Sequence, residues 1–94
     1  MFILVQHQIT DPARFWSSAQ QETSNLPSHL KLHHSFPTPD GSRAACVWEA
    51  PSVDALKSFI EPAVGGVSRN EYFEIANKEG IALPQSVSAK AAGR

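Results

Sequence analysis

Four histidines and one cysteine are the side chains of this chain with the plainest capacity for metal chemistry. They are His7, His29, His33, His34 and Cys46. Imidazole and thiolate suit nickel, zinc or copper, and a carboxylate such as Glu49 would complete such a site. No pair of histidines forms a recognised metal motif such as His-x-x-x-His on a helix, so a solvated or hydrogen-bonded side chain is the competing interpretation for each. His7 and His34 are the strongest candidates for a ligand role.

The alternating pattern around His33 and His34 is typical of a strand, so these neighbours are expected on opposite faces of a sheet. In that case they cannot chelate one ion from one subunit. If Phe36 pairs with Arg43 across the following turn, His33 lies opposite Cys46. A slip of one residue would change which groups share a face. Free cysteine is also among the most commonly buried residues, so plain burial is the competing interpretation of Cys46.

Aromatic side chains suggest a second kind of site. Trp48 and Tyr72 could stack on an aromatic ligand, with Glu74 or His7 handling a proton. The competing interpretation is that a small core needs aromatic bulk. Nothing resembles a nucleophile elbow, a phosphate loop or a dinucleotide fingerprint, because Gly65-Gly66 lacks the strand before it and the spacing after it. No organic cofactor is therefore expected.

The elements that must position these residues follow from hydrophobic periodicity and capping residues. Alternating and β-branched residues predict strands over residues 2–9, 30–36, 44–49 and 71–75. Apolar residues at helical spacing predict one helix after Asp11-Pro12, ending near Thr23. A second helix is predicted after Ser52, ending before Pro62 and Gly65-Gly66.

The segment Thr38-Pro39-Asp40-Gly41 has the composition of a β-turn and makes the middle two strands a hairpin. The resulting βαββαβ order is that of an α+β, ferredoxin-like fold. Right-handed crossovers put both helices on one face of a four-stranded antiparallel sheet. This domain is expected over residues 1–84, and residues 85–94, small and polar, are expected to form a flexible C-terminal tail.

Two helices leave the other face of this sheet without cover. The first strand is apolar on both sides, with Phe2 and Leu4 pointing one way and Ile3 and Val5 the other. Large exposed apolar patches are rare on monomers, so the same face of a second copy is the economical cover. Two such sheets would form a dimeric α+β barrel with a central cavity, where the candidate site residues would meet.

A set of residues in the middle of the chain carries a resemblance to a known family: His34, Pro39, Gly41, Cys46 and the run from Glu49-Ala50-Pro51-Ser52 into Val53-Asp54-Ala55-Leu56. In these residues the chain resembles a family of small bacterial domains of unknown function. One branch of that family is described as nickel-binding, and its members have the ferredoxin-like fold and pair as dimers. Gln6-His7-Gln8 stands where the family has a Val-His-Arg-like element. By matching positions, the resemblance implies a metal site formed by His7, His34, Cys46 and Glu49.

Composition narrows the classes of partner. The net charge is −1, and the eight basic and nine acidic residues are scattered, so nucleic acid is not an expected partner. The longest apolar run, Met1–Val5, is far shorter than the roughly 20 residues that a membrane span needs. It is not expected to be a signal peptide either, since no basic residue precedes it. A single cysteine makes no internal disulfide, and a cytoplasmic protein is expected.

Three functions from different classes follow from these observations. The first is a small dimeric protein that binds a divalent transition metal such as nickel, or a small ligand. The second is a cofactor-free monooxygenase or isomerase acting on a small aromatic substrate, to which Trp48 and Tyr72 point. The third is a non-catalytic dimer serving as a regulator or carrier.

Overall fold

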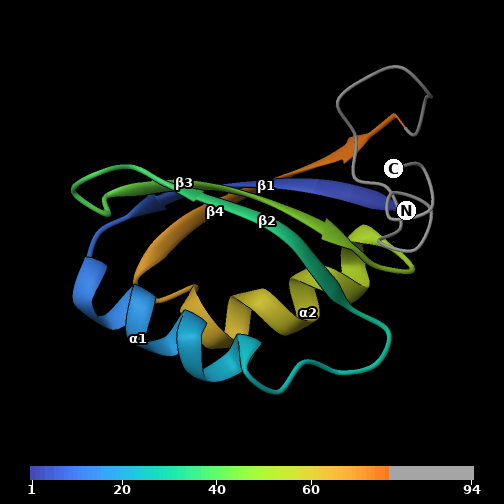
Figure 1. Cartoon of the computed structure of the whole chain (residues 1–94), viewed down its shortest axis with the longest axis horizontal. Coiled ribbons are helices and arrows are strands. Elements are labelled where there is room, and N and C mark those ends of the chain that lie inside the picture. The colour runs from blue at the N-terminus through green and yellow to red at the C-terminus, as the bar shows by residue number, and fades with distance from the viewer. Residues whose placement is uncertain (77–94) are drawn as a thin grey trace, which may run out of the picture.

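The computed structural model describes residues 1–76 of the chain, and its elements follow one another in the order βαββαβ (Figure 1). The strands are β1 (Phe2–Ile9), β2 (Lys31–Pro37), β3 (Arg43–Glu49) and β4 (Ser68–Ile75), and the helices are α1 (Pro12–Thr23) and α2 (Val53–Val64). The predicted order of elements is confirmed. The predicted domain end at residue 84 and the predicted tail over residues 85–94 lie outside the described residues.

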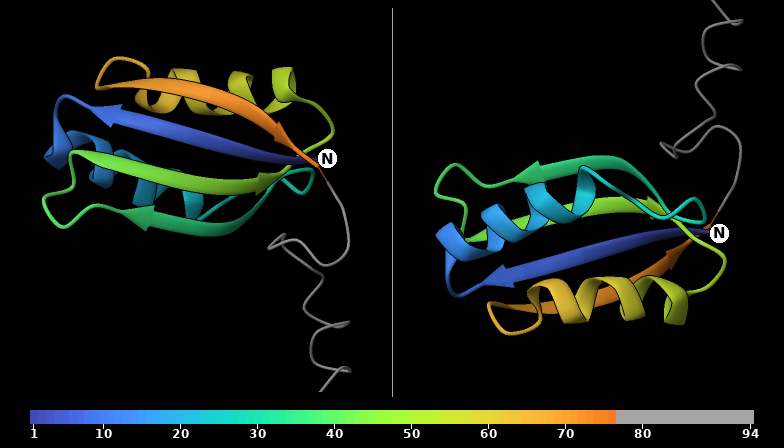
Figure 2. Two further views of the ribbon diagram at one scale, coloured as in Figure 1. Left: turned by 90° about the horizontal axis from the view of Figure 1, so that it is seen from above. Right: turned by 90° about the horizontal axis from the view of Figure 1, so that it is seen from below.

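The four strands form one antiparallel sheet in the order β2-β3-β1-β4. Both helices lie against the same face of this sheet, and the opposite face is uncovered in the described part of the chain (Figures 1 and 2). This arrangement confirms the predicted α+β ferredoxin-like fold. Among residues 1–76, no helix has the length and apolar character needed to cross a membrane.

Both helices begin at the residues that the sequence indicates. The Asp11 side chain accepts a hydrogen bond from the backbone nitrogen of Arg14 at 3.2 Å, and Pro12 occupies the first turn. Ser52 accepts from the backbone nitrogen of Ala55 at 3.0 Å. These side chains satisfy amides that the helices cannot satisfy themselves, which fixes where each helix starts.

Two boundaries differ from the sequence-based prediction. Helix α2 continues through Pro62 and ends at Val64, because a proline in the last turn costs only one backbone hydrogen bond where packing supports the helix. Strand β4 begins at Ser68, three residues earlier than predicted. Its pairing with β1 extends to Ile9 opposite Ser68. The first residues of β4 are polar and do not indicate a strand in the sequence, so pairing with β1 makes the strand longer than predicted.

The core lies between the sheet and the helices. On β1, Ile3 and Val5 point toward the helices and are fully buried. Leu56 of α2 is also fully buried. The alternation places Phe2 and Leu4 on the uncovered face, as predicted.

The hairpin of β2 and β3 has a register different from the expected one. Phe36 lies opposite Ala45, not Arg43, and a β-bulge interrupts the pairing between Leu32 and His34. The turn itself is confirmed, since the Gly41 amide donates to the Thr38 carbonyl at 2.9 Å. The extra residue in the bulge, His33, upsets the alternation on which the predicted faces depended.

Because of the bulge, His33 and His34 lie on the same face of the sheet, and the prediction of opposite faces is wrong. The His33 ring contacts Phe2 edge to face at 5.5 Å, and its Nε2 lies 3.0 Å from Glu49 Oε1. The His34 ring stacks on Phe36 at 5.5 Å. Both histidines are therefore on the side away from the helices.

The uncovered face carries large apolar side chains. Phe36 and Phe73 have 59% and 46% of their surface exposed, more than a core residue would keep. Apolar residues that share this face are Phe2, Leu4, Ala45, Val47 and Ile75. The prediction of an apolar uncovered face is therefore confirmed for the part of the chain that the structure describes.

Candidate functional site

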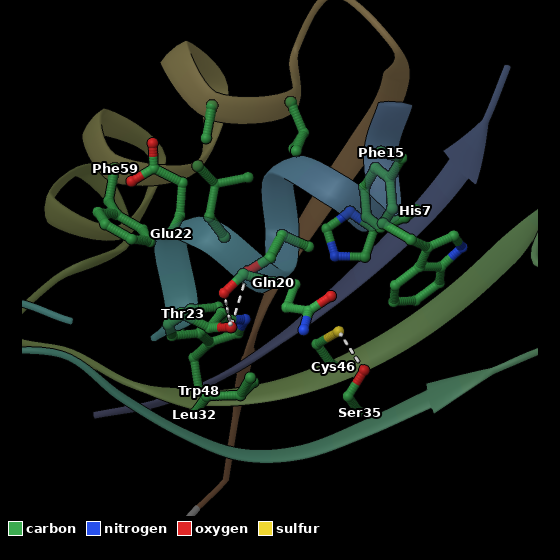
Figure 3. A pocket seen from close by; sticks show the side chains of 15 residues that line it. His7, Phe15, Gln20, Glu22, Thr23, Leu32, Ser35, Cys46, Trp48 and Phe59 are labelled. Atoms are coloured by element: carbon green, nitrogen blue, oxygen red, sulfur yellow. Dashed lines mark hydrogen bonds between the residues drawn. The ribbon is translucent and has the colours of Figure 1, made fainter. Parts of the chain in front are cut away.

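A cavity of about 420 Å³ lies between the sheet and the two helices (Figure 3). Small side chains leave this space, namely Ala19 on α1, Ala63 on α2 and Cys46 on β3. The helices lie over different halves of the sheet, α1 toward β2 and α2 toward β4, which opens the gap further (Figure 2). Protein interiors are otherwise close-packed, so a space of this size marks a place that can hold a small molecule. The larger wall residues are Phe15, Trp16, Leu32, Trp48, Phe59 and Ile60.

The indole nitrogen of Trp48, in the wall of this cavity, has no hydrogen-bond partner. It is the one such buried side-chain nitrogen or oxygen among residues 1–76. Only 4% of Trp48 is exposed, and its ring meets Phe59 edge to face at 6.0 Å. Buried donors in proteins are nearly always bonded, so this indole N–H, which has almost no accessible surface of its own, is an exception among the described residues.

His7 is one of the polar groups in the wall of the cavity, and its tautomer follows from its neighbours. Its Nδ1 lies 2.6 Å from Asn70 Oδ1. Asn70 Nδ2 in turn donates to Glu61 Oε2 at 2.9 Å, and a carboxylate can only accept. The amide oxygen therefore faces His7, and Nδ1 must carry the proton. The neutral ring is left with Nε2 as an acceptor in the cavity wall.

The environment keeps His7 neutral. Burial lowers the pKa of His7 below its ordinary value of 6.5, and it outweighs the hydrogen bond that His7 donates to Asn70 and the charge of Glu61, which both raise it. The ring also packs edge to face on Phe15 at 5.1 Å. A neutral, oriented imidazole is a proton acceptor near neutral pH.

Glu61 anchors this network at the surface. Burial raises the pKa of its carboxyl, but hydrogen bonds from Tyr72 and Asn70 and the charge of Lys57 outweigh burial and lower it. The Tyr72 hydroxyl donates to Glu61 Oε2 at 2.5 Å, and burial together with this bond raises the pKa of Tyr72 far above its ordinary value. Glu61 is therefore ionised and Tyr72 protonated, which fixes the direction of every hydrogen bond from Tyr72 to His7.

Cys46 lies in the cavity wall beside Ser35. Its thiol donates to Ser35 Oγ at 3.5 Å (Figure 3). Burial raises the pKa of Cys46, and the bond to Ser35 lowers it only in part. The thiol is therefore protonated near neutral pH, whereas metal binding requires the thiolate.

The four residues predicted to form a metal site do not come together in one chain. His7 and Cys46 lie on the helix-covered face, and His34 and Glu49 lie on the opposite face. Glu49 is instead paired with His33, whose hydrogen bond lowers the pKa of the carboxyl. Within residues 1–76, no group of three or more His, Cys, Asp or Glu side chains could hold a metal ion.

The three residues predicted to bind an aromatic ligand are also separated. Trp48 lines the cavity, whereas Tyr72 is held by Glu61 at the outer edge of the sheet and Glu74 is exposed on β4. The sequence-based prediction placed their site in a chamber between subunits, on the uncovered face. That location is wrong for Trp48, because it pairs with Ile3 and so faces the helices.

Sequence reasoning missed Asn70 and Glu61. Asn70 precedes the predicted strand, and only the true start of β4 shows that it shares a face with Tyr72, opposite His7. Glu61 follows Lys57 by one helical turn, a spacing that signals a surface pair but gives no hint of a contact with β4.

The chain matches no protein-family model, no curated protein and no solved structure. The fold is therefore assigned from its own element order and strand pairing.

Proposed function

We propose that this protein binds a small, mostly apolar molecule in the cavity between the sheet and the helices. The observation that carries the proposal is the cavity of about 420 Å³, whose wall is formed mostly by apolar side chains such as Phe15, Leu32 and Phe59. Small-molecule sites are typically apolar spaces with a few placed polar groups, and His7 has that role here.

Binding is tested by titrating ¹⁵N-labelled protein with 2-naphthol and following the indole N–H resonances of the two tryptophans. Trp16 and Trp48 both line the cavity, so saturable shifts of both are expected. Ala63→Phe fills the cavity and should abolish the shifts. Ala13→Phe adds the same side chain at an exposed position of α1 and should leave them unchanged. Equal shifts in both variants would place the 2-naphthol elsewhere and reject the proposal.

Catalysis is a second candidate function, and the tautomer of His7 favours it. A neutral imidazole with Nε2 free could remove a proton from an acidic O–H or C–H of the bound molecule. The resulting imidazolium would keep its Nδ1–H on Asn70, with the charge of Glu61 behind it. Such a base suits a cofactor-free isomerase or monooxygenase acting on a small aromatic substrate.

This second candidate is tested with 2-tetralone, an uncharged two-ring ketone with an acidic C–H. The protein should accelerate deuterium exchange at that carbon, measured by proton NMR, and His7→Gln should remove the acceleration. His29→Gln, at an exposed position, is the matched control. Acceleration that survives in His7→Gln would assign the base elsewhere.

Nickel binding and dimer formation also stay proposals. The predicted metal residues lie on two faces, so a site that uses all four needs donors from more than one chain. Calorimetric titration of tag-free protein with nickel tests this. The absence of heat, or heat unchanged in a His7→Gln, His34→Gln double variant, would reject these ligands.

A further inference from the structure

We propose that Asn70 is a positioning residue that holds His7 ready to accept a proton from the molecule in the cavity, and that the exposed carboxylate of Glu61 adjusts the strength of this base through Asn70. This inference rests on the proposed function in its catalytic form, and it adds the residues that orient and regulate the base. It follows from the accessibility of one nitrogen, the contacts of one amide and the place of one charge.

His7 Nε2 is the atom of the network that a bound molecule can reach. It has no hydrogen-bond partner, yet the one fully buried side-chain nitrogen or oxygen without a partner among residues 1–76 belongs to Trp48. His7 Nε2 therefore keeps accessible surface, and the ring forms part of the cavity wall (Figure 3). A general base has to reach the proton that it removes, and this nitrogen meets that condition.

The Asn70 side chain is held by groups from three elements. Its Oδ1 accepts from His7 Nδ1 on β1 at 2.6 Å, and its Nδ2 donates to Glu61 Oε2 on α2 at 2.9 Å. The buried hydroxyl of Ser68, at the start of β4, lies 2.8 Å from the same Oδ1 and 3.0 Å from the Val64 carbonyl. The amide cannot rotate without losing these bonds, so it fixes the plane and the tautomer of the imidazole.

The chemistry of an amide defines what Asn70 can do. An amide oxygen accepts a hydrogen bond but has no acidic proton to pass on, so Asn70 orients His7 without relaying a proton. In the transfer itself, the proton of an acidic C–H of the bound molecule moves to His7 Nε2. The electron pair of that bond stays on the molecule as an enolate, and the same nitrogen returns a proton in the reverse step. The Nδ1–H stays on Asn70 throughout.

Glu61 is the charged group that acts on His7. Its carboxylate raises the pKa of His7, although burial of the ring outweighs this effect. Because Asn70 lies between them, the charge does not contact the ring. The same charge in direct contact would make His7 a stronger base that is protonated at higher pH. The other titratable groups around the network and the cavity are Lys57 on α2, Tyr72 on β4, Cys46 on β3 and Glu22 at the cavity margin on α1.

The decisive test is a charge-swap variant, Asn70→Asp with Glu61→Gln. It keeps the net charge, and the glutamine amide can still donate to the new carboxylate. That carboxylate contacts the ring, so the pKa of His7 should rise by roughly one pH unit or more. Deuterium exchange of 2-tetralone, followed against pH by proton NMR, should shift to higher pH by the same amount and reach its plateau there. Histidine ¹⁵N NMR reports the pKa and the tautomer of His7 independently.

Asn70→Leu is the second variant, since it keeps a side chain of similar shape without its polar atoms. His7 should no longer hold a single tautomer, and the exchange rate should fall at least about tenfold. The affinity for 2-naphthol should not change, because Asn70 is not among the residues that line the cavity. The matched control for the charge swap is Asn25→Asp with Glu74→Gln, at exposed positions, which should leave exchange and tautomer as in the wild type.

The outcomes separate this inference from the proposed function. If 2-naphthol does not bind, the proposed function fails and this inference with it. If 2-naphthol binds but the wild type does not accelerate exchange, catalysis and this inference fail while the binding function stands. If exchange is accelerated but the charge-swap variant keeps the wild-type pH profile, or Asn70→Leu keeps the wild-type tautomer and rate, the positioning role is wrong while both functions stand.

Discussion

The use of an amide rather than a carboxylate beside His7 decides the charge of that histidine. A carboxylate in contact with the ring would stabilise the imidazolium strongly. Asn70 orients the ring through Nδ1 and keeps the charge of Glu61 one residue further away. His7 is thus fixed in one tautomer without being charged, which suits a group that accepts a proton or a hydrogen bond from an apolar molecule.

The lowered pKa of His7 predicts how stability depends on pH. Above pH 6.5 His7 is neutral in both the folded and unfolded chain, and this contribution to stability is fully present. As the pH falls below 6.5, His7 becomes protonated in the unfolded chain but stays neutral in the folded chain. The free energy of unfolding should therefore fall, by at most about 1.4 kcal/mol per pH unit. Urea unfolding between pH 7.5 and 5.5 measures this.

His7→Gln should flatten that pH dependence, and the exposed control His29→Gln should keep it. The carboxyls with lowered pKa values, Asp40, Glu49 and Glu61, titrate in a more acidic range, so they do not obscure the window. A slope that persists in His7→Gln would contradict the assignment.

The buried Trp48 side chain leads to a second prediction, on the stability of two variants at this position. In protein without ligand, Trp48→Phe removes a buried donor that has no partner together with part of the indole ring, so it should cost about 1–2 kcal/mol of stability, mostly from lost packing. Trp48→Ala removes the whole ring and should cost about 3–5 kcal/mol. Urea unfolding compares the two. A loss above about 2 kcal/mol for Trp48→Phe would show that the N–H is bonded after all.

Among the elements, the hairpin turn between β2 and β3 is tied to helix α1. Gly41 has a φ of +74°, in the left-handed region that favours glycine, and its carbonyl accepts from the Trp16 indole at 3.0 Å. Asp40 accepts from the Ser42 amide and the Thr38 hydroxyl, which closes the turn. The turn thereby holds one wall of the cavity through Trp16.

Gly41→Ala should therefore destabilise the protein by about 1–2 kcal/mol, from the left-handed backbone alone. The added Cβ would also lie 3.0 Å from Trp16 Nε1, so the Trp16 indole resonance should move. Gly66→Ala is the matched control: its Cβ would meet nothing within 4 Å, and stability should be unchanged or slightly higher. Thermal unfolding and NMR of the two variants check this, and equal stability would contradict the role of the turn.

The elements also show what local sequence can and cannot predict. The caps at Asp11 and Ser52 and the turn ending at Gly41 were predictable, because each depends on residues next to it in the chain. The bulge at His33 was not, because a bulge is a relation between two strands and leaves no mark in one of them. One extra residue there places His33 on the face away from the helices, whereas the alternating pattern predicted the face opposite to that of His34.

At the scale of the whole molecule, the uncovered sheet face is the feature that residues 1–76 of a single chain do not account for. Its apolar side chains come from all four strands, and none of the described elements packs on them. Exposed apolar side chains on one sheet face are characteristic of an interface, and a symmetric pair would bury the same residues from each copy.

The protein should therefore sediment as a dimer, and Phe73→Glu should convert it to a monomer by placing a charge in the apolar face. Gln21→Glu adds the same charge at an exposed position of α1 and should leave the dimer intact. Sedimentation velocity near 100 μM, well above the Kd of a stable dimer, measures this. A wild-type chain that sediments as a monomer would contradict the prediction.

Sequence by itself determined the order of elements, both helix starts, the turn and the apolar character of both sheet faces, because periodicity and capping act over a few neighbouring residues. Only the tertiary structure decided which functional side chains lie close together. It split the expected metal residues between two faces, and it brought Glu61, Asn70 and His7, which are distant in the chain, into one network. It also turned Trp48 toward the helices. Strand register and helix placement set these contacts, and both arise from packing between segments that share no local signal.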